Sequence, residues 1–440
     1  MDFFQREQRD GIRFSWNFWP CNKIGAARIV APVGCMYTPM KEIENLALVQ
    51  YQPVLCKQCQ TVLNPYCEVD YRFKTWLCPI CTNKNSFPQH YAQHISPQQL
   101  PAELMADYTT IEYILPQQTA QQKPIFMLLV DTALSSEELA ELKDSLQQSI
   151  SFIPQDAHVG LITYGKMAFV HELGFSDCPK SYVFRGDKEL SAQEIQTQLG
   201  INMGSDPLNK GDTNTLKRFL VPVQDCEFAL NSILDDLQSD PWPTKQGCRP
   251  ERCVGAALNI AISLLEASGS SNRGSRIINL VGGAVTIGPG KIVDESLKEK
   301  IRSHLDMQKE RENTRHQKAA MKFYGDCAVR AQKCGIVIDF FVAALDQVGV
   351  VEMKPCFEMT GGFYIMTDSF GNPVFKESFR KFFELDETSQ ELKMGFLATT
   401  KLHTSKEFKI SGVIGQCAPI KQSTVPTYVS PTQIGIGGTN

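Results

Sequence analysis

Residues 124–139 read PIFMLLVDTALSSEEL, and this stretch decides the fold because it joins a buried strand to a helix. The run from Ile125 to Val130 is apolar without alternation, which is typical of a strand buried on both faces of a sheet. Ser135 followed by Glu138 forms a capping-box pattern, which predicts that a helix begins here. A strand that leads directly into a helix is the repeating unit of α/β folds. The stretch therefore predicts the start of an α/β domain.

The same alternation continues to about residue 385. Helices are predicted at CVGAALNIAISLLEA, at VFKESFRKFFEL and along a long charged segment, 296–333, whereas residues 174–250 show a looser pattern. Further strands are predicted at HVGLITYG, AFVHEL, RIINLV, GIVIDFFV and GGFYIM. Together these segments predict a doubly wound, mostly parallel sheet that helices cover on both faces.

Both ends of the chain have a different texture. Residues 12–19 alternate between apolar and polar side chains, as in a half-buried strand, and ELKMGFLATTKLH and KEFKISGVIGQC resemble short strands. We expect the two ends to pair in one β-sandwich, and the ending IGIGGTN favours a C-terminally truncated form. The overall prediction is a multi-domain α+β protein. Its predicted domains are sandwich strands in 1–50, a zinc ribbon in 51–100, a linker in 101–122, the α/β trunk in 123–388 and an incomplete sandwich continuation in 389–440.

The composition indicates a folded chain without a strong overall charge. Of the 440 residues 42% are hydrophobic, and the formal net charge is −4, so no global cationic field is available for a polyphosphate backbone. The N-terminus lacks the apolar region of a signal peptide, and no apolar run is long enough to span a membrane. These features predict a cytosolic or nuclear protein whose membrane contact is peripheral.

Two Cys-x-x-Cys pairs stand 18 residues apart in CKQCQTVLNPYCEVDYRFKTWLCPIC, residues 56–81. Cys56, Cys59, Cys78 and Cys81 supply four thiolates, which is the preferred ligand set of structural zinc. Fifteen cysteines without an even framework fit a reducing compartment, which favours zinc over disulfide or thiol chemistry. Cys67 could replace a ligand, but a small packed side chain is the simpler interpretation.

A four-cysteine site leaves no open position for water or substrate, so the sequence predicts one structural zinc ion and no catalytic or cofactor-binding residue. A nucleic-acid finger would place a basic helix beside the ligands. Here the loop carries Glu68 and Asp70 against Arg72 and Lys74, which favours a structural ribbon. A zinc-ribbon nucleic-acid-binding protein remains the alternative.

The sequence VDTALSS is similar to the cation site of von Willebrand factor A-type domains, where the first strand ends in Asp-x-Ser-x-Ser and a threonine and an aspartate follow from later loops. Asp131 and Ser135 match this pattern, but Ala133 has no oxygen to donate. Pro250 stands at the expected threonine, and the segment 281–283 replaces the aspartate. The sequence therefore predicts a trunk without bound magnesium, in which Asp131 caps a helix or a turn.

Three weaker patterns have ordinary interpretations. His90 and His94 have helical spacing without a glutamate base, so we expect surface histidines. The segment GGAVTIGPGK, 282–291, is followed by Ile292 rather than serine or threonine, which favours a turn over a phosphate loop. A basic stripe along the charged helix is more simply a solvated face than an anion site. Its members are Arg311, Arg315, Lys318 and Lys322.

The order of these modules resembles the paired inner-coat subunits of coat protein complex II (COPII). The segments RDGIRFSWNFWP, VLCKQCQTVLNPYC, TWLCPIC and PIFMLLVDTALSSEEL resemble in particular the GTPase-activating subunit of that coat. The cargo-adaptor subunit shares the ribbon and the trunk but usually carries a long N-terminal extension rich in proline and glutamine. Only the four zinc ligands carry over residue by residue.

The resemblance implies a coat protein of the endoplasmic reticulum rather than an enzyme. It implies a heterodimer with the cargo-adaptor subunit, binding to a membrane-bound small GTPase in its GTP form, contact with outer-coat subunits and no nucleic acid. Family members also stimulate GTP hydrolysis through an arginine finger. That arginine belongs to helical and gelsolin-like regions, so none of the arginines in residues 1–440 inherits the role.

Overall fold

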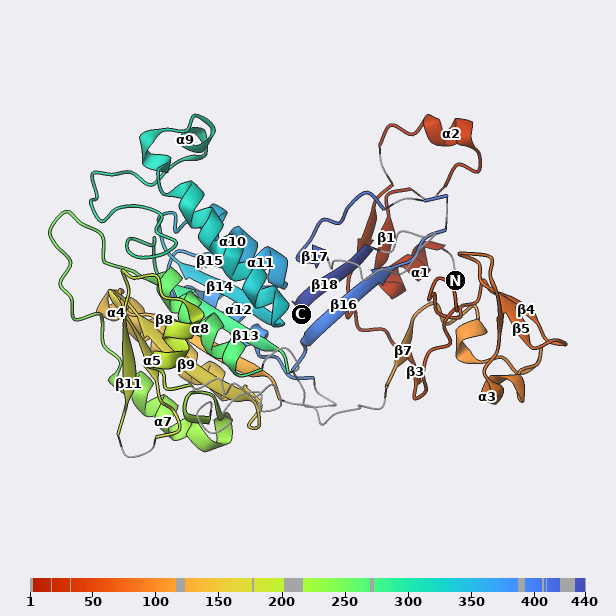
Figure 1. Cartoon of the computed structure of the whole chain (residues 1–440), viewed down its shortest axis with the longest axis horizontal. Helices are drawn as coiled ribbons and strands as arrows, with labels where there is room; N and C mark the ends of the chain where they lie inside the picture. Colours follow the sequence, from red (N-terminus) through yellow and green to blue (C-terminus); the bar gives the residue numbers. More distant parts are fainter. Residues whose placement is uncertain are drawn as a thin grey trace. The chain divides into compact units, whose positions relative to one another are not determined.

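The structure is a computed structural model, and Figure 1 shows its secondary structure elements. The chain divides into two units: Met1–Ala120 with Lys401–Gly412 and Lys421–Gln433, and Gln121–Thr400 with Val413–Ile420 and Ile434–Asn440. The domain limits given above stay predictions. The residues that the structure describes are 3–16, 18–31, 33–115, 123–175, 178–201, 217–269, 273–386, 392–405, 407–408, 410–419 and, for the backbone alone, 432–439.

An eight-stranded mixed sheet forms the centre of the second unit, which we call the trunk. The strand predicted at 125–130 is β8, and its seven residues are all buried. The strands follow one another in the order β11 (Ser181–Arg185), β10 (Met167–His171), β9 (His158–Tyr164), β8 (Ile125–Asp131), β13 (Ser275–Val281), β14 (Ile336–Ala343) and β15 (Tyr364–Thr367), and β12 (Val221–Pro222) pairs with β9. The neighbouring strands β9, β8, β13, β14 and β15 run parallel to one another. Strands β10 and β12 pair antiparallel with β9, and β11 pairs antiparallel with β10.

Helices cover both faces of this sheet, which confirms the doubly wound α/β prediction (Figure 1). One buried hydrophobic cluster lies on each face of the sheet, because alternate residues of each strand point to opposite sides. The helices packed on one face are α5 (Ala192–Gln198), α8 (Val254–Ala267), α10 (Gln317–Lys333) and α11 (Val350–Thr360). Those on the other face are α4 (Ser136–Ile150), α7 (Val223–Asp236) and α12 (Pro373–Phe382).

The first unit consists of short elements. Its buried cluster lies around Trp76 and the cysteines of the ribbon. The N-terminal elements are α1 (Phe3–Asp10), β1 (Ile12–Phe14), α2 (Lys23–Ala27), β2 (Cys35–Tyr37) and β3 (Ala47–Val49). They are followed by β4 (Glu68–Asp70), β5 (Thr75–Leu77), β6 (Lys84–Ser86), α3 (Gln89–Ala92), the 3-10 helix η1 (Ala102–Leu104) and β7 (Ile111–Tyr113). Strands β4, β5 and β6 form the antiparallel sheet of the zinc module, and β3 pairs with β7.

The expected strand at 12–19 ends earlier than predicted. Among the described residues of this segment, those of β1 pair with β2, and the N–H of Ser15 donates to the carbonyl of Gly34 at 2.9 Å. Trp19 instead packs edge-on against Phe14 and Phe408. After the trunk, β16 (Gly395–Leu402), β18 (Thr432–Thr439) and β17 (Ala418–Pro419) form a sheet in that order. In the described part of the chain, the N-terminal strands β1 and β2 pair with each other, and the C-terminal strands β16, β17 and β18 form their own sheet. The ring contact of Trp19 with Phe408 connects the two ends. The β-sandwich stays a prediction.

The prediction of one long helix at 296–333 is wrong. The segment divides into α9 (His304–Gln308), the 3-10 helix η3 (Glu312–Thr314) and α10, which begins only at Gln317. Arg302 explains the interruption, because its guanidinium is buried and donates to Glu352 of α11. Ser303 then starts a new helix with a capping box to Asp306. The looser region 174–250 likewise contains β11, α5, β12 and α7, which sequence reasoning did not resolve.

Candidate metal centre

The four predicted zinc ligands lie together. The sulfur atoms of Cys56 and Cys81 are 3.5 Å apart, those of Cys59 and Cys78 are 3.6 Å apart, and all four lie within 4.8 Å of one another. Tetrahedral zinc with Zn–S bonds of about 2.3 Å requires sulfur pairs about 3.8 Å apart. The cluster therefore fits structural zinc.

Two equivalent backbone turns build this cluster. The N–H of Gln60 donates to the carbonyl of Cys56 at 2.9 Å, and the N–H of Thr82 donates to that of Cys78 at the same distance. The residue after each pair is left-handed, with φ of 61° at Gln60 and 59° at Thr82. Because each Cys-x-x-Cys pair closes the same turn, both present their sulfurs to one point.

Asn85 supports the cluster from the next shell of residues. Its side chain is 2% exposed, and Nδ2 lies 3.4 Å from Sγ of Cys56. Its Oδ1 accepts the N–H of Lys57 at 3.0 Å, which fixes the amide orientation. Such outer hydrogen bonds orient metal ligands. Sequence reasoning missed this residue, because an asparagine four positions after the last cysteine carries no signal of its own.

The electrostatics of the cluster favour a bound cation. Burial raises the pKa of Cys56, but hydrogen bonds from the N–H groups of Cys59 and Gln58 outweigh it and lower that pKa to about 6. Burial raises the pKa of Cys78, and burial with the neighbouring sulfurs raises that of Cys81. Four thiolates at this spacing repel one another unless a divalent ion offsets their charge.

The other metal-binding possibilities in this module are not supported. Cys67 is buried outside the four-sulfur group, and burial raises the pKa of its thiol to about 11. His90 and His94 are exposed, as predicted. The helix α3 has four residues, QHYA, without lysine or arginine. In the described ribbon no basic recognition helix therefore lies beside the cysteines, which weakens the nucleic-acid alternative.

The trunk position that corresponds to an A-type cation site is occupied by protein groups. Asp131 is fully buried at the end of β8, and its Oδ2 accepts a hydrogen bond from Nε of Arg252 at 2.5 Å. The N–H of Ala133 donates to Oδ1 at 2.9 Å, which is the turn-capping role predicted for Asp131. Ser135 caps α4 by accepting the N–H of Glu138. Sequence reasoning missed Arg252, because its partner is 121 positions away.

The glycine-rich segment 282–291 forms a turn, as predicted. The N–H of Ile292 donates to the carbonyl of Val285 at 2.9 Å, which closes the loop. Gly288 has φ of 77°, and a Cβ there would lie 1.9 Å from the carbonyl oxygen of Gly186. Lys291 pairs with Asp294. The loop is therefore closed on protein groups rather than arranged as a phosphate cradle.

The basic stripe does not lie on one helix. Arg311 pairs with Asp306 at 2.9 Å, Lys318 pairs with Glu310 at 2.9 Å, and Arg315 pairs with Glu299 at 2.8 Å and with Asp294. These arginines precede α10, whereas the lysines lie on it. The observed ion pairs agree with the solvated-face interpretation.

A cluster of four cysteines followed in one chain by a doubly wound α/β trunk defines the class of this protein. The chain belongs to the Sec23/Sec24 family of coat components. Residues 121–384 match the Sec23/Sec24 trunk domain, and residues 53–91 match the Sec23/Sec24 zinc finger.

A solved structure shows the same fold over nearly the whole chain. The crystal structure of the human COPII-coat protein Sec24c is similar over 98% of this chain and 55% of that one, with 15% identity and a TM-score of 0.65. The chain thus spans about half the length of that relative. A von Willebrand factor type A protein from Catenulispora acidiphila is similar over 64% of this chain and 46% of that one, with 10% identity and a TM-score of 0.33. Within the described residues, every helix is too short or too polar to cross a bilayer.

Proposed function

We propose that the chain is an inner-layer component of the COPII coat that acts in vesicle formation between the endoplasmic reticulum and the Golgi. The observation that carries the proposal is the family trunk and the family zinc finger in one chain. In this role the protein is cytosolic and binds peripherally to the endoplasmic reticulum membrane. Its partners are the cargo-adaptor subunit, a membrane-bound small GTPase in its GTP form and the outer-coat subunits.

The arrangement of residues supports a binding scaffold rather than a catalyst. Four cysteines fill every coordination position of a tetrahedral ion, which leaves no place for a reactive water. The carboxylate of Asp131 is used by a guanidinium and backbone amides, so it is not available as a base. The chemistry of both positions is therefore consistent with holding a surface in shape.

Binding to the two partners tests the proposal. The purified chain is mixed with immobilised adaptor subunit and, separately, with the small GTPase loaded with a non-hydrolysable GTP analogue. We expect retention on both, and the GDP-loaded GTPase is the control that should retain little. A chain that binds neither partner, while its circular dichroism shows a folded protein, would refute the proposal.

GTPase activation is tested separately. The resemblance places the arginine finger in regions that residues 1–440 do not match, so we expect unchanged GTP turnover when this chain is added to the GTPase. Single-turnover hydrolysis with and without the chain measures this. An acceleration by a factor of ten or more would show that trunk contacts alone order the catalytic groups of the GTPase.

We further propose that Cys56, Cys59, Cys78 and Cys81 hold one zinc ion. The support is the tetrahedral spacing of their sulfurs and their place in the matched zinc finger. Elemental analysis of the purified chain should give one zinc per polypeptide. The substitution Cys56→Ser should lower this content, whereas the matched substitution Cys67→Ser should leave it at one. Equal zinc contents in the two variants would contradict the assignment.

A further inference from the structure

The buried pair of Asp131 and Arg252 lies where the parallel strands of the trunk end. Asp131 is the last residue of β8, and Arg252 precedes α8 by two positions. Their side chains are 0% and 5% exposed. An isolated carboxylate would be strongly disfavoured at such a position, so the adjacent positive charge is required.

Three donors already engage the carboxylate of Asp131. Besides the guanidinium and the N–H of Ala133, it accepts the N–H of Gly282 through Oδ2 at 2.8 Å. The Ser135 hydroxyl is committed to the cap of α4, and Ala133 offers no side-chain oxygen. A divalent ion prefers several oxygen ligands, so the residues present do not fit the cation that this fold holds elsewhere.

The guanidinium makes the connections that an ion would make between loops. Its Nη2 donates to the carbonyl of Ala133 at 2.7 Å, and its Nη1 points to the carbonyl of Ala284 at 3.4 Å. The backbone N–H of Arg252 also donates to Oγ1 of Thr286 at 2.8 Å. One side chain therefore ties the 131–135 loop to the 282–286 loop.

Two glycines of the second loop leave room for the side chains around this pair. A Cβ on Gly283 would lie 2.5 Å from Nη1 of Arg252, and a Cβ on Gly282 would lie 2.0 Å from Cδ2 of Leu134. A larger residue at position 283 would displace the guanidinium, and a larger residue at position 282 would displace Leu134. Gly283 therefore leaves the space that the Arg252 side chain occupies.

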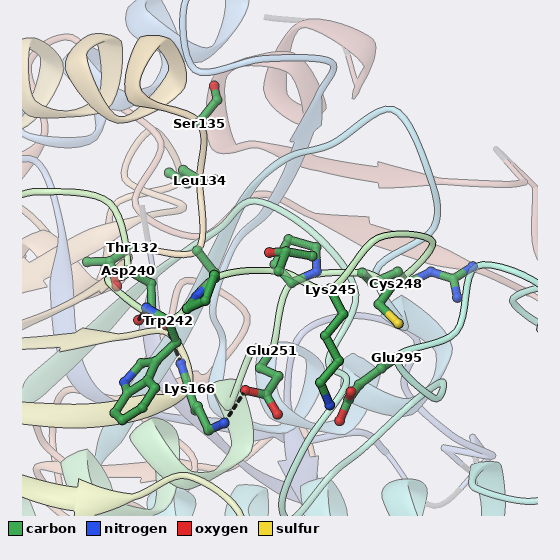
Figure 2. A pocket seen from close by; sticks show the side chains of 15 residues that line it. Thr132, Leu134, Ser135, Lys166, Asp240, Trp242, Lys245, Cys248, Glu251 and Glu295 are labelled. Carbon is green, nitrogen blue, oxygen red and sulfur yellow. Dashed lines mark hydrogen bonds and ion pairs between the residues drawn. The ribbon is translucent and has the colours of Figure 1, made fainter.

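A cavity of about 500 Å³ opens above this position, and it is lined by the 132–135 loop and by segments around Trp242 and Glu251. Figure 2 shows Leu134 and Ser135 on the loop, and the ion pair of Lys166 with Glu251 across the cavity. Asp240 connects this loop to Lys166, because its N–H donates to the carbonyl of Thr132 at 2.8 Å and its Oδ2 accepts the N–H of Lys166 at 2.6 Å. The shape of the cavity thus depends on the position of the 131–135 loop.

We propose that Arg252 is a built-in cation, which holds the carboxyl end of the trunk sheet in one conformation and makes this end independent of divalent ions. The inference goes beyond the proposed coat function and does not depend on it. It predicts that the cavity above the 131–135 loop keeps its shape whether or not magnesium is present.

Thermal unfolding of the full chain tests this inference, with magnesium chloride as the probe against sodium chloride of equal ionic strength. The unfolding midpoint of the wild-type chain should not respond to magnesium. Arg252→Ala should lower the midpoint, because Asp131 is left buried and unpaired. Magnesium should then partly restore it, since the vacated space gives the carboxylate an ion and its waters. At ten times its dissociation constant an ion shifts the folding equilibrium about elevenfold, or about 3–5 °C for a domain of this size.

Arg276→Ala is the matched control. Arg276 and Asp339 form another fully buried pair in the same sheet, with Nε to Oδ2 at 2.9 Å and Nη2 to Oδ1 at 2.7 Å, and the guanidinium lies over the ring of Phe382. Its loss should lower the midpoint without any magnesium response. If Arg252→Ala does not fold, Arg252→Gln is measured instead, with the same expected response. A magnesium response in the wild-type chain, or equal responses of the two arginine variants, would overturn the inference.

Discussion

His171 predicts a measurable loss of trunk stability between pH 7 and pH 5. The side chain ends β10, is half-buried, and its Nε2 lies 3.0 Å from Oγ1 of Thr163. Burial lowers the pKa of His171 to about 4, from an ordinary value of 6.5. Because the folded-state pKa lies below the unfolded one, the unfolded chain binds more protons between these values, and stability falls as the pH falls from 6.5 to 4.

The two pKa values set the size of the effect. The difference between the two pKa values corresponds to at most about 3 kcal/mol, of which about 2 kcal/mol falls between pH 7 and pH 5. Water reaches part of the ring and screens the interaction, so we expect about 1–2 kcal/mol. Other histidines also titrate in this range, so the difference between the wild-type chain and His171→Gln is the relevant quantity.

Urea denaturation at pH 7 and pH 5 measures this difference. The wild-type chain should lose about 1–2 kcal/mol more than His171→Gln over the interval. His90→Gln, which changes an exposed histidine, is the control and should behave as the wild type. Equal pH dependence of the wild-type chain and His171→Gln would refute the lowered pKa of His171.

Two further substitutions test packing in each unit. Gly255→Ala in α8 places a Cβ 2.0 Å from the carbonyl oxygen of Pro289, so it should lower the free energy of unfolding by about 1–3 kcal/mol in urea denaturation. Gly325→Ala in α10 meets no atom within 4 Å and should raise that free energy by about 0.5–1 kcal/mol. Equal effects of the two substitutions would contradict this packing. In the first unit, Glu103→Ala should cost about 3–5 kcal/mol, because the buried carboxylate accepts the hydroxyls of Tyr51 at 3.1 Å, Tyr91 at 2.5 Å and Tyr113 at 3.3 Å. Glu112→Ala, which changes an exposed residue of β7, is the control, and the fluorescence of buried Trp76 follows the unfolding of both variants. A similarly small loss of stability in the two variants would show that the Glu103 carboxylate does not stabilise this unit.

Local patterns predicted the parts of the trunk that local physics determines. The strand β8 and the helix that starts after Ser135 were predicted correctly, because burial and helix capping depend on residues that are neighbours in the sequence. The four cysteines predicted as zinc ligands lie close together, since both turns are complete within a few residues of each Cys-x-x-Cys pair.

Contacts between distant residues account for what the sequence did not show. Charged residues spaced along 296–333 favour one helix, yet the buried pair of Arg302 with Glu352, 50 positions apart, interrupts it. The role of Arg252 could not be predicted from its local sequence either. One arginine before an apolar helix is ordinary, and its role depends on its ion pair with Asp131. A pattern within one element does not contain a pairing between elements.

The zinc finger and the trunk reach the same result by different chemistry. In the finger, the fourth cysteine takes the position that a catalytic site leaves for water. In the trunk, a guanidinium joins the end of β8 to the loop after β13, and Gly283 leaves room for it. Each cation position is thus closed by protein groups, and in each the charge serves to fix loops. A surface fixed in this way loses little conformational entropy when a partner binds, which is the property that a coat scaffold requires.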